Sequence, residues 1–456
     1  MHVLRNRIAF TQSIIVRKCS TTTSVRHFAS VSPPITTTRN HKVVVVGSGS
    51  AGIALSHQLL RKGNFSKDDI AIVDPATWHH YQPGWTMVGG GLKRKEDMKR
   101  PLHSLIEPRL EFYNKSVAII NPKENHLLLG DGDRIGYEQL ILAPGVKIDY
   151  DSVKGLSEAM ANPDSLVASI YSYDYCDKVF RNIQRIKQGE ALFTQPAGVV
   201  KCAGAPQKIM WLALDHWRRA GAYNAVPSQS GIRVTFATGL PTMFGVAKYS
   251  NVLNELREKR GVTGLFNHNL VSIDSSNKIA TFERAGGSNS QEKIHRRYDF
   301  LHVAPRNVPH AFVQQSGLGD AAGFVDVDAH TLRHRAFSNV WALGDAASLP
   351  TSKTVAAITS QAPALTHNVL RGLEGKEADA LYDGYTSCPL LTGDKEVLLA
   401  EFKYGGVPKE TFGEWFGIDQ AVPRRAFYHL KKDFFPWVYD RWHVKGRWGG
   451  PTGWIW

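Results

Sequence analysis

The chain has 456 residues and a formal net charge of +14, with 55 lysines and arginines against 41 aspartates and glutamates. Apolar residues make up 43% and charged residues 21%, which excludes a wholly disordered chain and, at this length, favours two or three domains. Four cysteines in so long a chain exclude a disulfide-rich secreted scaffold, and no apolar stretch reaches the roughly 18 residues of a membrane-spanning helix.

Residues 1–39 contain arginine and lysine but no acidic residue, and the first acidic residue of the chain is Asp68. Serine and threonine are frequent in the same stretch. This composition is typical of a mitochondrial transit peptide, and a basic tail without a targeting role is the alternative. The sequence therefore predicts a mitochondrial protein.

A glycine-rich turn joins the first expected strand to the first expected helix. Residues 41–46 are a strand-like apolar run, residues 47–52 read Gly-Ser-Gly-Ser-Ala-Gly, and residues 53–61 have a helical pattern. A second apolar strand at residues 70–73 ends at Asp74. This order of elements predicts a dinucleotide-binding βαβ unit.

The turn residues have separate expected roles. Gly47 permits the tight turn, Gly49 lets the backbone approach a pyrophosphate, and Gly52 lets the helix pack closely on the strand. The N-terminus of the helix would face the phosphates. Asp74 is expected to bind ribose hydroxyls.

Two later segments decide which dinucleotide is expected. Residues 137–145 and 339–345 resemble two FAD motifs of flavoproteins with two dinucleotide-binding domains. The second motif ends in Gly-Asp, and its carboxylate, here Asp345, hydrogen-bonds the ribityl chain. A helix expected over residues 354–370 would direct its positive N-terminal dipole toward the flavin, beside the charge of Lys353. The three motifs together predict FAD.

The place where an NAD-binding turn would stand contains a cysteine. Residues 193–200 follow an apolar strand pattern, yet no G-x-G-x-x-G sequence occurs there. Nicotinamide nucleotide is therefore not the expected electron donor. A single-subunit NADH:quinone dehydrogenase on the same fold is the alternative that this absence disfavours, and a flavin-binding protein without catalytic activity is a second alternative.

Cys202 precedes a helix that Pro206 is expected to open. A helix N-terminus with Lys201 adjacent would lower the pKa of the thiol and favour the thiolate. Cys388 stands in a segment with glycine and proline that is expected to be a loop, and Cys176 is assigned an unreactive role. Taken singly, each cysteine also fits an inert thiol. None belongs to a C-x-x-C pair, so a metal site has no support.

The C-terminal part is basic and aromatic. Residues 424–447 contain seven lysines and arginines against two aspartates, and five of the eleven tryptophans fall in the last twenty residues. Apolar residues recur at helical spacing, and Pro436 is placed to open a second short helix. Such segments suit the headgroup layer of an anionic membrane, while packing on the protein's own core is the alternative. No nucleic-acid-binding motif accompanies the charge, so nucleic acid is not an expected partner.

Five segments of the chain resemble the mitochondrial sulfide:quinone oxidoreductase family. The resemblance implies a flavoprotein fold with two dinucleotide-binding domains, non-covalent FAD, sulfide as electron donor and ubiquinone as acceptor. It also implies monotopic attachment to the inner mitochondrial membrane by C-terminal helices. The segments are residues 80–86, 199–210, 349–354, 382–390 and 446–451.

Carried over by matching residues, Cys202 and Cys388 are the implied redox pair. Two departures, Ala51 for glycine and Pro144 before Gly145, do not touch the cysteines. Hydrosulfide would attack Cys388 and leave a persulfide there, glutathione or sulfite would take the sulfur, and two electrons would pass through FAD to ubiquinone. The expected FAD-binding residues are Gly47, Gly49, Ser50, Ala51, Gly52, Asp74, Gln82, Val117, Gly145, Asp345 and Lys353.

The expected fold is α/β, with two Rossmann-like domains of the FAD/NAD(P)-binding type and a C-terminal amphipathic helical membrane-attachment segment. Cys202 falls in the second domain, and Cys388 falls in the C-terminal part with the membrane and quinone segment. The expected divisions are 1–39 for the transit peptide, 40–150 and 306–375 for the two parts of the FAD domain, 151–305 for the second domain, and 376–456 for the C-terminal domain.

Overall fold

The computed structural model describes residues 38–286 and 293–450. Residues 1–37 of the expected transit peptide and the tryptophans at 454 and 456 therefore lie outside the described residues.

Seven strands form the first sheet, and β1 (Thr38–Val46) lies at its centre. β2 (Ile70–Val73) and β8 (Arg134–Leu142) flank it, both parallel to it. Val43 to Val46 are buried, as expected for a strand with both faces covered. The outer strands are β5 (Glu111–Tyr113), β6 (Val117–Asn121), β7 (His126–Leu129) and β19 (Val340–Ala342).

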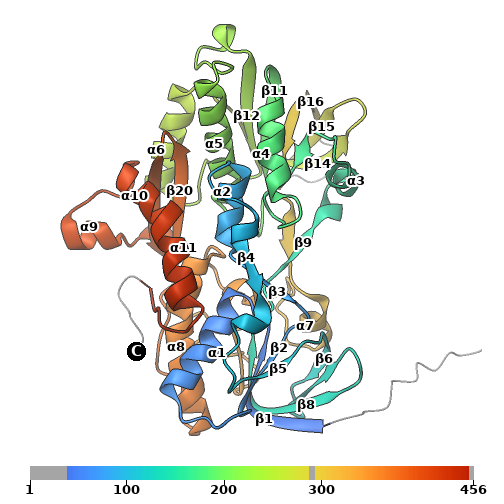
Figure 1. Ribbon diagram of the computed structural model, residues 1–456, viewed down its shortest axis with the longest axis vertical. Helices are drawn as coiled ribbons and strands as arrows, with labels where there is room; N and C mark the ends of the chain where they lie inside the picture. The colour runs from blue at the N-terminus through green and yellow to red at the C-terminus, as the bar shows by residue number, and fades with distance from the viewer. Residues whose placement is uncertain (1–37, 287–292, 451–456) are drawn as a thin grey trace, which may run out of the picture. The chain divides into compact units, whose positions relative to one another are not determined.

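Two helices begin beyond the carboxyl ends of these strands. α1 (Ser50–Lys62) follows β1 after the glycine turn, and α8 (Val355–Leu373) follows β19. The two helices pack side by side (Figure 1). Their N-termini face the edge of a parallel sheet where α/β proteins bind ligands. The helices predicted over residues 53–61 and 354–370 are confirmed.

A second sheet of five parallel strands follows in the chain, with strand order β10, β17, β11, β12, β13. The predicted α/β fold with two Rossmann-like domains is confirmed. The strands of this sheet are β10 (Val167–Ala168), β11 (Gly189–Gln195), β12 (Ile232–Thr238), β13 (Thr263–Phe266) and β17 (Phe300–His302). Its helices are α4 (Cys176–Arg185), α5 (Ala205–Arg219) and α6 (Ala247–Lys259).

Shorter elements connect and cover the two sheets. An antiparallel group of three strands lies beside the second sheet in Figure 1. These strands are β14 (His268–Asp274), β15 (Ile279–Arg284) and β16 (Ile294–Arg297). The remaining short elements are β3 (Trp78–His80), α2 (Trp85–Gly89), β4 (Lys99–Pro101), β9 (Lys147–Asp149), α3 (Leu156–Ala161), β18 (Arg306–Val308) and α7 (Ala311–Gln315).

Cys388 lies in a strand, so the expectation of a loop is wrong. β20 (Thr386–Gly393) pairs antiparallel with β21 (Glu396–Lys403), and Cys388 stands opposite Ala400. Pro389 is tolerated because β20 is an edge strand with β21 as its neighbour in the three-stranded sheet. The third strand of that sheet is β22 (Val407–Pro408).

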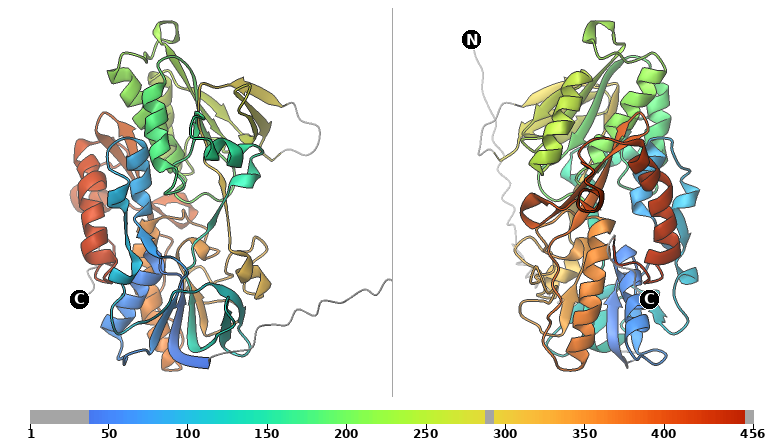
Figure 2. Two further views of the ribbon diagram at one scale, coloured as in Figure 1. Left: turned by 45° about the vertical axis from the view of Figure 1, so that its right-hand side comes forward. Right: turned by 90° about the vertical axis from the view of Figure 1, so that its left-hand side faces the viewer.

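Residues 425–443 form one continuous helical stretch, called here the C-terminal helical segment. It contains α10 (Arg425–His429), a π-helical turn, α11 (Phe435–Val438) and a second π-helical turn, and it follows α9 (Thr411–Phe416). Pro436 lies in the first turn of α11, as predicted, but the chain does not leave the helical conformation before it. The π-turn at Leu430–Phe434 accommodates the missing N–H of the proline. Figure 2 shows this segment beside α1 and α2.

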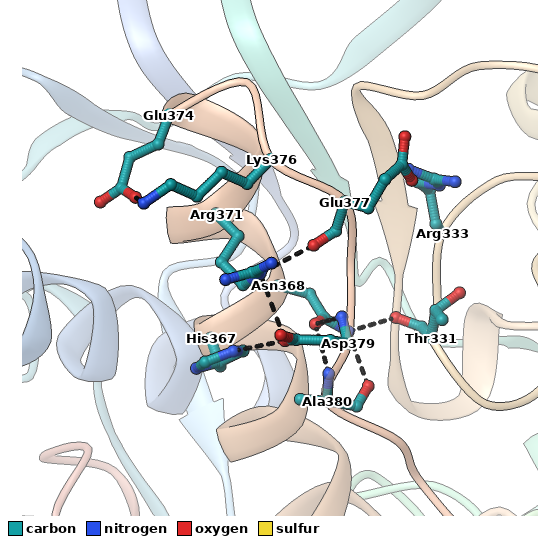
Figure 3. Close-up of polar contacts among 10 residues, drawn as sticks. All are labelled: Thr331, Arg333, His367, Asn368, Arg371, Glu374, Lys376, Glu377, Asp379 and Ala380. Atoms are coloured by element: carbon teal, nitrogen blue, oxygen red, sulfur yellow. Dashed lines mark hydrogen bonds and ion pairs between the residues drawn. The ribbon is translucent and has the colours of Figure 1, made fainter.

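The link from α8 to β20 is fastened to the end of α8 (Figure 3). The buried Asn368 amide donates to the carbonyls of Thr331 and Ala380 and accepts from the backbone N–H of Asp379. Asp379 also accepts from His367 at 2.7 Å. These contacts fix the path of the chain toward β20, and therefore toward Cys388.

Candidate active site

The glycine turn has the backbone geometry that a phosphate site needs. Gly47 has φ +98°, and a Cβ there would collide with the carbonyl of Ala143. A Cβ on Gly52 would collide with the carbonyl of Gly47, so helix and strand can approach only because this residue is glycine. Apart from its chain neighbours, no residue has an atom within 4 Å of the position that a Cβ on Gly49 would take. The open side of Gly49 leaves room for a phosphate group against the backbone.

A cavity of about 440 Å³ extends from this turn to Cys202. Its volume is within the usual range for a cofactor site. Val117 and Gly52 do not line it, and Val117 pairs with Leu129 of β7 instead. The expected site residues that do line it are Gly47, Gly49, Ser50, Ala51, Asp74, Gln82, Gly145, Cys202, Asp345 and Lys353.

Asp74 stands at the end of β2 and holds the turn. One of its carboxylate oxygens accepts from the Ser48 backbone N–H at 2.6 Å and from the Ser48 hydroxyl at 2.7 Å. Its other oxygen accepts from the Ala76 N–H at 2.8 Å. Asp74 therefore orders the turn itself, and its role toward ribose stays a prediction.

Asp345, the last residue of the second FAD motif, and Lys353, which precedes α8, both line the cavity. Gly344, with φ +71°, turns the chain after β19 and brings Asp345 to the cavity. The Lys353 ammonium donates to the backbone carbonyls of Asp345 and Ala347. Burial raises the pKa of Asp345 and lowers the pKa of Lys353. Thr354 caps α8 by accepting from the Ala357 N–H at 3.0 Å.

These features fit FAD. The open face of Gly49 and the N-terminus of α1 suit a pyrophosphate, while Asp345, Lys353 and the capped N-terminus of α8 suit a flavin with its ribityl chain. The residues that would hold these two groups line one cavity, and Cys202 lines it too.

Cys202 and Cys388, 186 residues apart in the sequence, have their sulfurs 3.7 Å apart. The structure holds both as free thiols. A Cβ on Gly204 would lie 2.5 Å from the Cys388 sulfur, so glycine at this position is what lets β20 approach α5. Cys202 has φ +53°, a left-handed conformation that is strained for a side chain of this type. A modest movement would bring the sulfurs to the 2.05 Å of a disulfide.

The pKa values of the two thiols are shifted in opposite directions. The hydrogen bond from the Cys388 thiol, together with nearby Lys208 and Lys431, holds the pKa of Cys202 well below its ordinary value. The same hydrogen bond and burial hold the pKa of Cys388 well above its ordinary value. Cys202 is therefore the thiolate and Cys388 the thiol of the reduced pair.

The lysine that contacts Cys202 is Lys208, which corrects the expectation for Lys201. Lys208 lies in the first turn of α5, and its ammonium is 3.2 Å from the Cys202 sulfur. The Lys201 ammonium instead donates to the Gln82 side chain at 2.8 Å. The geometry follows from the helix, because side chains in a first turn lean back toward the N-terminus.

Sequence patterns did not indicate which residues of the C-terminal helical segment line the cavity. They are Lys431, Phe435, Val438, Tyr439 and His443. Burial lowers the pKa of Lys431 to about 8. Their spacing in a basic, aromatic segment gives no sign of which face turns inward.

Fold and site together define a flavoprotein with two Rossmann-like domains and a cysteine pair. Residues 41–188 match the pyridine nucleotide-disulphide oxidoreductase family. The mitochondrial sulfide:quinone oxidoreductase of Schizosaccharomyces pombe is 44% identical over 432 residues, covering 91% of this chain and 92% of that protein. The Mus musculus protein of the same name is 38% identical, covering 91% and 89%.

The fold comparison agrees. The X-ray structure of the sulfide:quinone oxidoreductase from Aquifex aeolicus is similar to this chain with a TM-score of 0.71 at 17% identity, covering 88% of this chain and 91% of that one. The chain belongs to the mitochondrial sulfide:quinone oxidoreductase family. It is a flavin-dependent oxidoreductase, and its cofactor is FAD.

Proposed function

We propose that this chain oxidises hydrogen sulfide at Cys202 and Cys388 and passes the two electrons through FAD to ubiquinone. The observation that carries the proposal is the 3.7 Å distance between the sulfurs of Cys388 and Cys202, with Cys202 lining the cavity and Lys208 3.2 Å from its sulfur. The names of the relatives supply the substrates, sulfide and quinone.

The first step acts on the oxidised, disulfide form of the pair. Hydrosulfide attacks the Cys388 sulfur, the bond to Cys202 breaks, and the products are a Cys388 persulfide and a Cys202 thiolate. Cys202 is the better leaving group because Lys208 and Lys431 stabilise its thiolate. The same lysines give the pocket a positive charge that favours the anion HS⁻ over neutral H₂S.

The second step returns the pair to its starting state. A small nucleophile, glutathione or sulfite, takes the outer sulfur of the persulfide, and a thiolate remains on Cys388. The two thiolates then re-form their S–S bond and release two electrons. FAD held by the glycine turn and by Asp345, Lys353 and the N-terminus of α8 would supply the acceptor for these two electrons and the donor to ubiquinone.

An exposed aromatic surface supports attachment to the inner mitochondrial membrane. Among residues 38–286 and 293–450, no helix is both long and apolar enough to cross a bilayer. Exposed aromatic side chains nevertheless occur on α9 and on the C-terminal helical segment, close to basic residues. Membrane lipid and quinone would meet the protein here. These side chains are Trp415 (51% exposed), Phe416 (66%), Phe434 (39%) and Trp437 (50%).

Removing aromatic side chains from this surface should weaken membrane binding. We expect the double variant Phe434→Ser, Trp437→Ser to bind vesicles of inner-membrane lipid composition at least about tenfold less tightly, because each ring buries apolar area in the interface. Vesicle co-sedimentation measures it. Val226→Ser, which removes an equally exposed apolar side chain from the second domain, is the matched control. Unchanged binding of the double variant would exclude this surface as the attachment site.

An anaerobic titration tests the function as a whole. Sulfide should remove the flavin absorbance of the holoenzyme, and added ubiquinone should restore it. NADH should leave the absorbance unchanged, because the turn between β11 and α5 has no glycine fingerprint and is occupied by Cys202. Bleaching by NADH and not by sulfide would favour a NADH:quinone dehydrogenase instead.

A further inference from the structure

The C-terminal helical segment is bonded directly to the glycine turn. The Tyr439 hydroxyl lies 2.7 Å from the Ser50 hydroxyl and 2.7 Å from Nε2 of His79. Nδ1 of His79 lies 3.1 Å from the Ser48 carbonyl oxygen, and Nε2 of His443 lies 3.1 Å from the Ser50 carbonyl oxygen. Residues from opposite ends of the chain therefore share one buried network.

The direction of each hydrogen bond in this network follows from burial. Burial lowers the pKa of His79 to about 4, so the ring is neutral near pH 7 and has one donor and one acceptor. Its Nδ1–H must donate to the Ser48 carbonyl, which leaves Nε2 to accept from the Tyr439 hydroxyl. Tyr439 in turn accepts from Ser50. Tyr439 thus holds Ser50 and His79 in fixed orientations.

A second set of contacts ties the residues just after the segment to α1. Nδ1 of His57 lies 2.6 Å from the Val444 carbonyl oxygen. A Cβ on Gly446 would lie 2.6 Å from the backbone nitrogen of Gln58, so the chain there rests directly on the helix backbone. Asp440 of the segment also forms an ion pair with Arg100 of β4. The segment is therefore fastened along the helix whose N-terminus the phosphates would meet.

The same segment forms a wall of the cofactor cavity. The residues of the glycine turn and those of the segment line one continuous space. Ser50, the neighbour of Gly49, contacts Tyr439 of this wall directly. The residues that the segment contributes are Lys431, Phe435, Val438, Tyr439 and His443.

We propose that Tyr439 is a positioning residue for FAD, and that the docked C-terminal helical segment and the bound cofactor stabilise each other. Tyr439 acts through Ser50 and His79, which hold the backbone of the phosphate turn. Because the coupling is reciprocal, FAD strengthens the docking of the segment as much as the segment strengthens the binding of FAD. The coupling needs neither sulfide nor membrane.

The test removes a single oxygen atom. Tyr439→Phe keeps the ring contacts with His79, Tyr81 and His443 but leaves Ser50 and Nε2 of His79 without their partner. We expect FAD to leave the holoenzyme about tenfold faster, followed by the rise in flavin fluorescence after dilution. Tyr428→Phe is the matched control: it is a buried tyrosine of the same segment that does not line the cavity.

Hydrogen exchange distinguishes positioning from a general loss of stability. Amides of residues 435–444 should exchange faster in the Tyr439→Phe holoenzyme, and faster again in either protein after FAD is removed, while those of β12 keep their rates. Equal FAD release from the two tyrosine variants would overturn the proposal. So would exchange in residues 435–444 that does not respond to FAD. Both measurements are made without sulfide or vesicles, so they stand or fall independently of the proposed catalysis.

Discussion

Replacing Cys388 by serine should abolish sulfide-dependent quinone reduction, with a loss on the order of 10³-fold or more. In the proposed mechanism hydrosulfide breaks a bond between Cys388 and Cys202, which a serine hydroxyl cannot form, and no persulfide can form on serine. Cys388 itself does not line the cavity, so the variant should keep its FAD. Steady-state quinone reduction with sulfide, together with the flavin content of the purified protein, gives the answer.

Cys176→Ser is the matched control for this variant. Cys176 is also buried, and burial raises the pKa of its thiol to about 12, which makes it unreactive. We expect turnover close to that of the unchanged protein. Near-normal turnover of the Cys388 variant would refute the redox pair, whatever the control does.

Lys208→Met should have the second-largest effect, because it removes the cation 3.2 Å from the Cys202 sulfur. The hydrogen bond from Cys388 and the positive charge of Lys208 lower the pKa of Cys202 in the folded protein. Without that charge the pKa rises. The thiolate then forms only at higher pH, and at neutral pH we expect alkylation of Cys202 about tenfold slower. The pH profile of iodoacetamide labelling of the reduced protein measures the shift.

The Lys201→Met variant tests whether the sequence neighbour of Cys202 affects the pKa of its thiol as the contacting Lys208 does. Lys201 precedes Cys202, but its ammonium bonds Gln82. We therefore expect the labelling profile of Cys202 in this variant to stay in place. A shift as large as that of the Lys208 variant would mean that the general charge of the pocket, and not the contact, sets the pKa.

Local sequence patterns predicted much of the part of the site that is expected to bind FAD. The apolar strand, the glycine turn and the acid after β2 lie within 34 residues of one another, from His41 to Asp74. The Gly-Asp motif before α8 is equally local. Short spacings of this kind specify a backbone conformation by themselves, because Gly47 and Gly344 adopt positive φ that other residues resist.

The surroundings of the two cysteines were predicted less completely. The family resemblance pointed to Cys202 and Cys388, but the surroundings of Cys388 were expected to be a loop. β21 supplies the pairing that makes residues 386–393 a strand, and pairing partners are not visible in one segment alone. The sequence points to Lys201, the neighbour of Cys202, because only the path of the chain around Cys202 shows that the Lys208 side chain returns to the sulfur.

By itself the sequence determined the class of cofactor, the order of the elements and the residue types available for chemistry. Only the tertiary structure decided which of these residues meet. It brings the sulfurs of Cys202 and Cys388, 186 residues apart in the sequence, to 3.7 Å from each other, and the absence of a side chain at Gly204 permits this approach. It also turned Lys431 and Tyr439 of a basic, aromatic segment inward to the cofactor cavity while Trp437 stayed exposed. The reason is physical: the periodicity of a helix fixes which residues share a face, but packing against α1 and the glycine turn fixes where that face points.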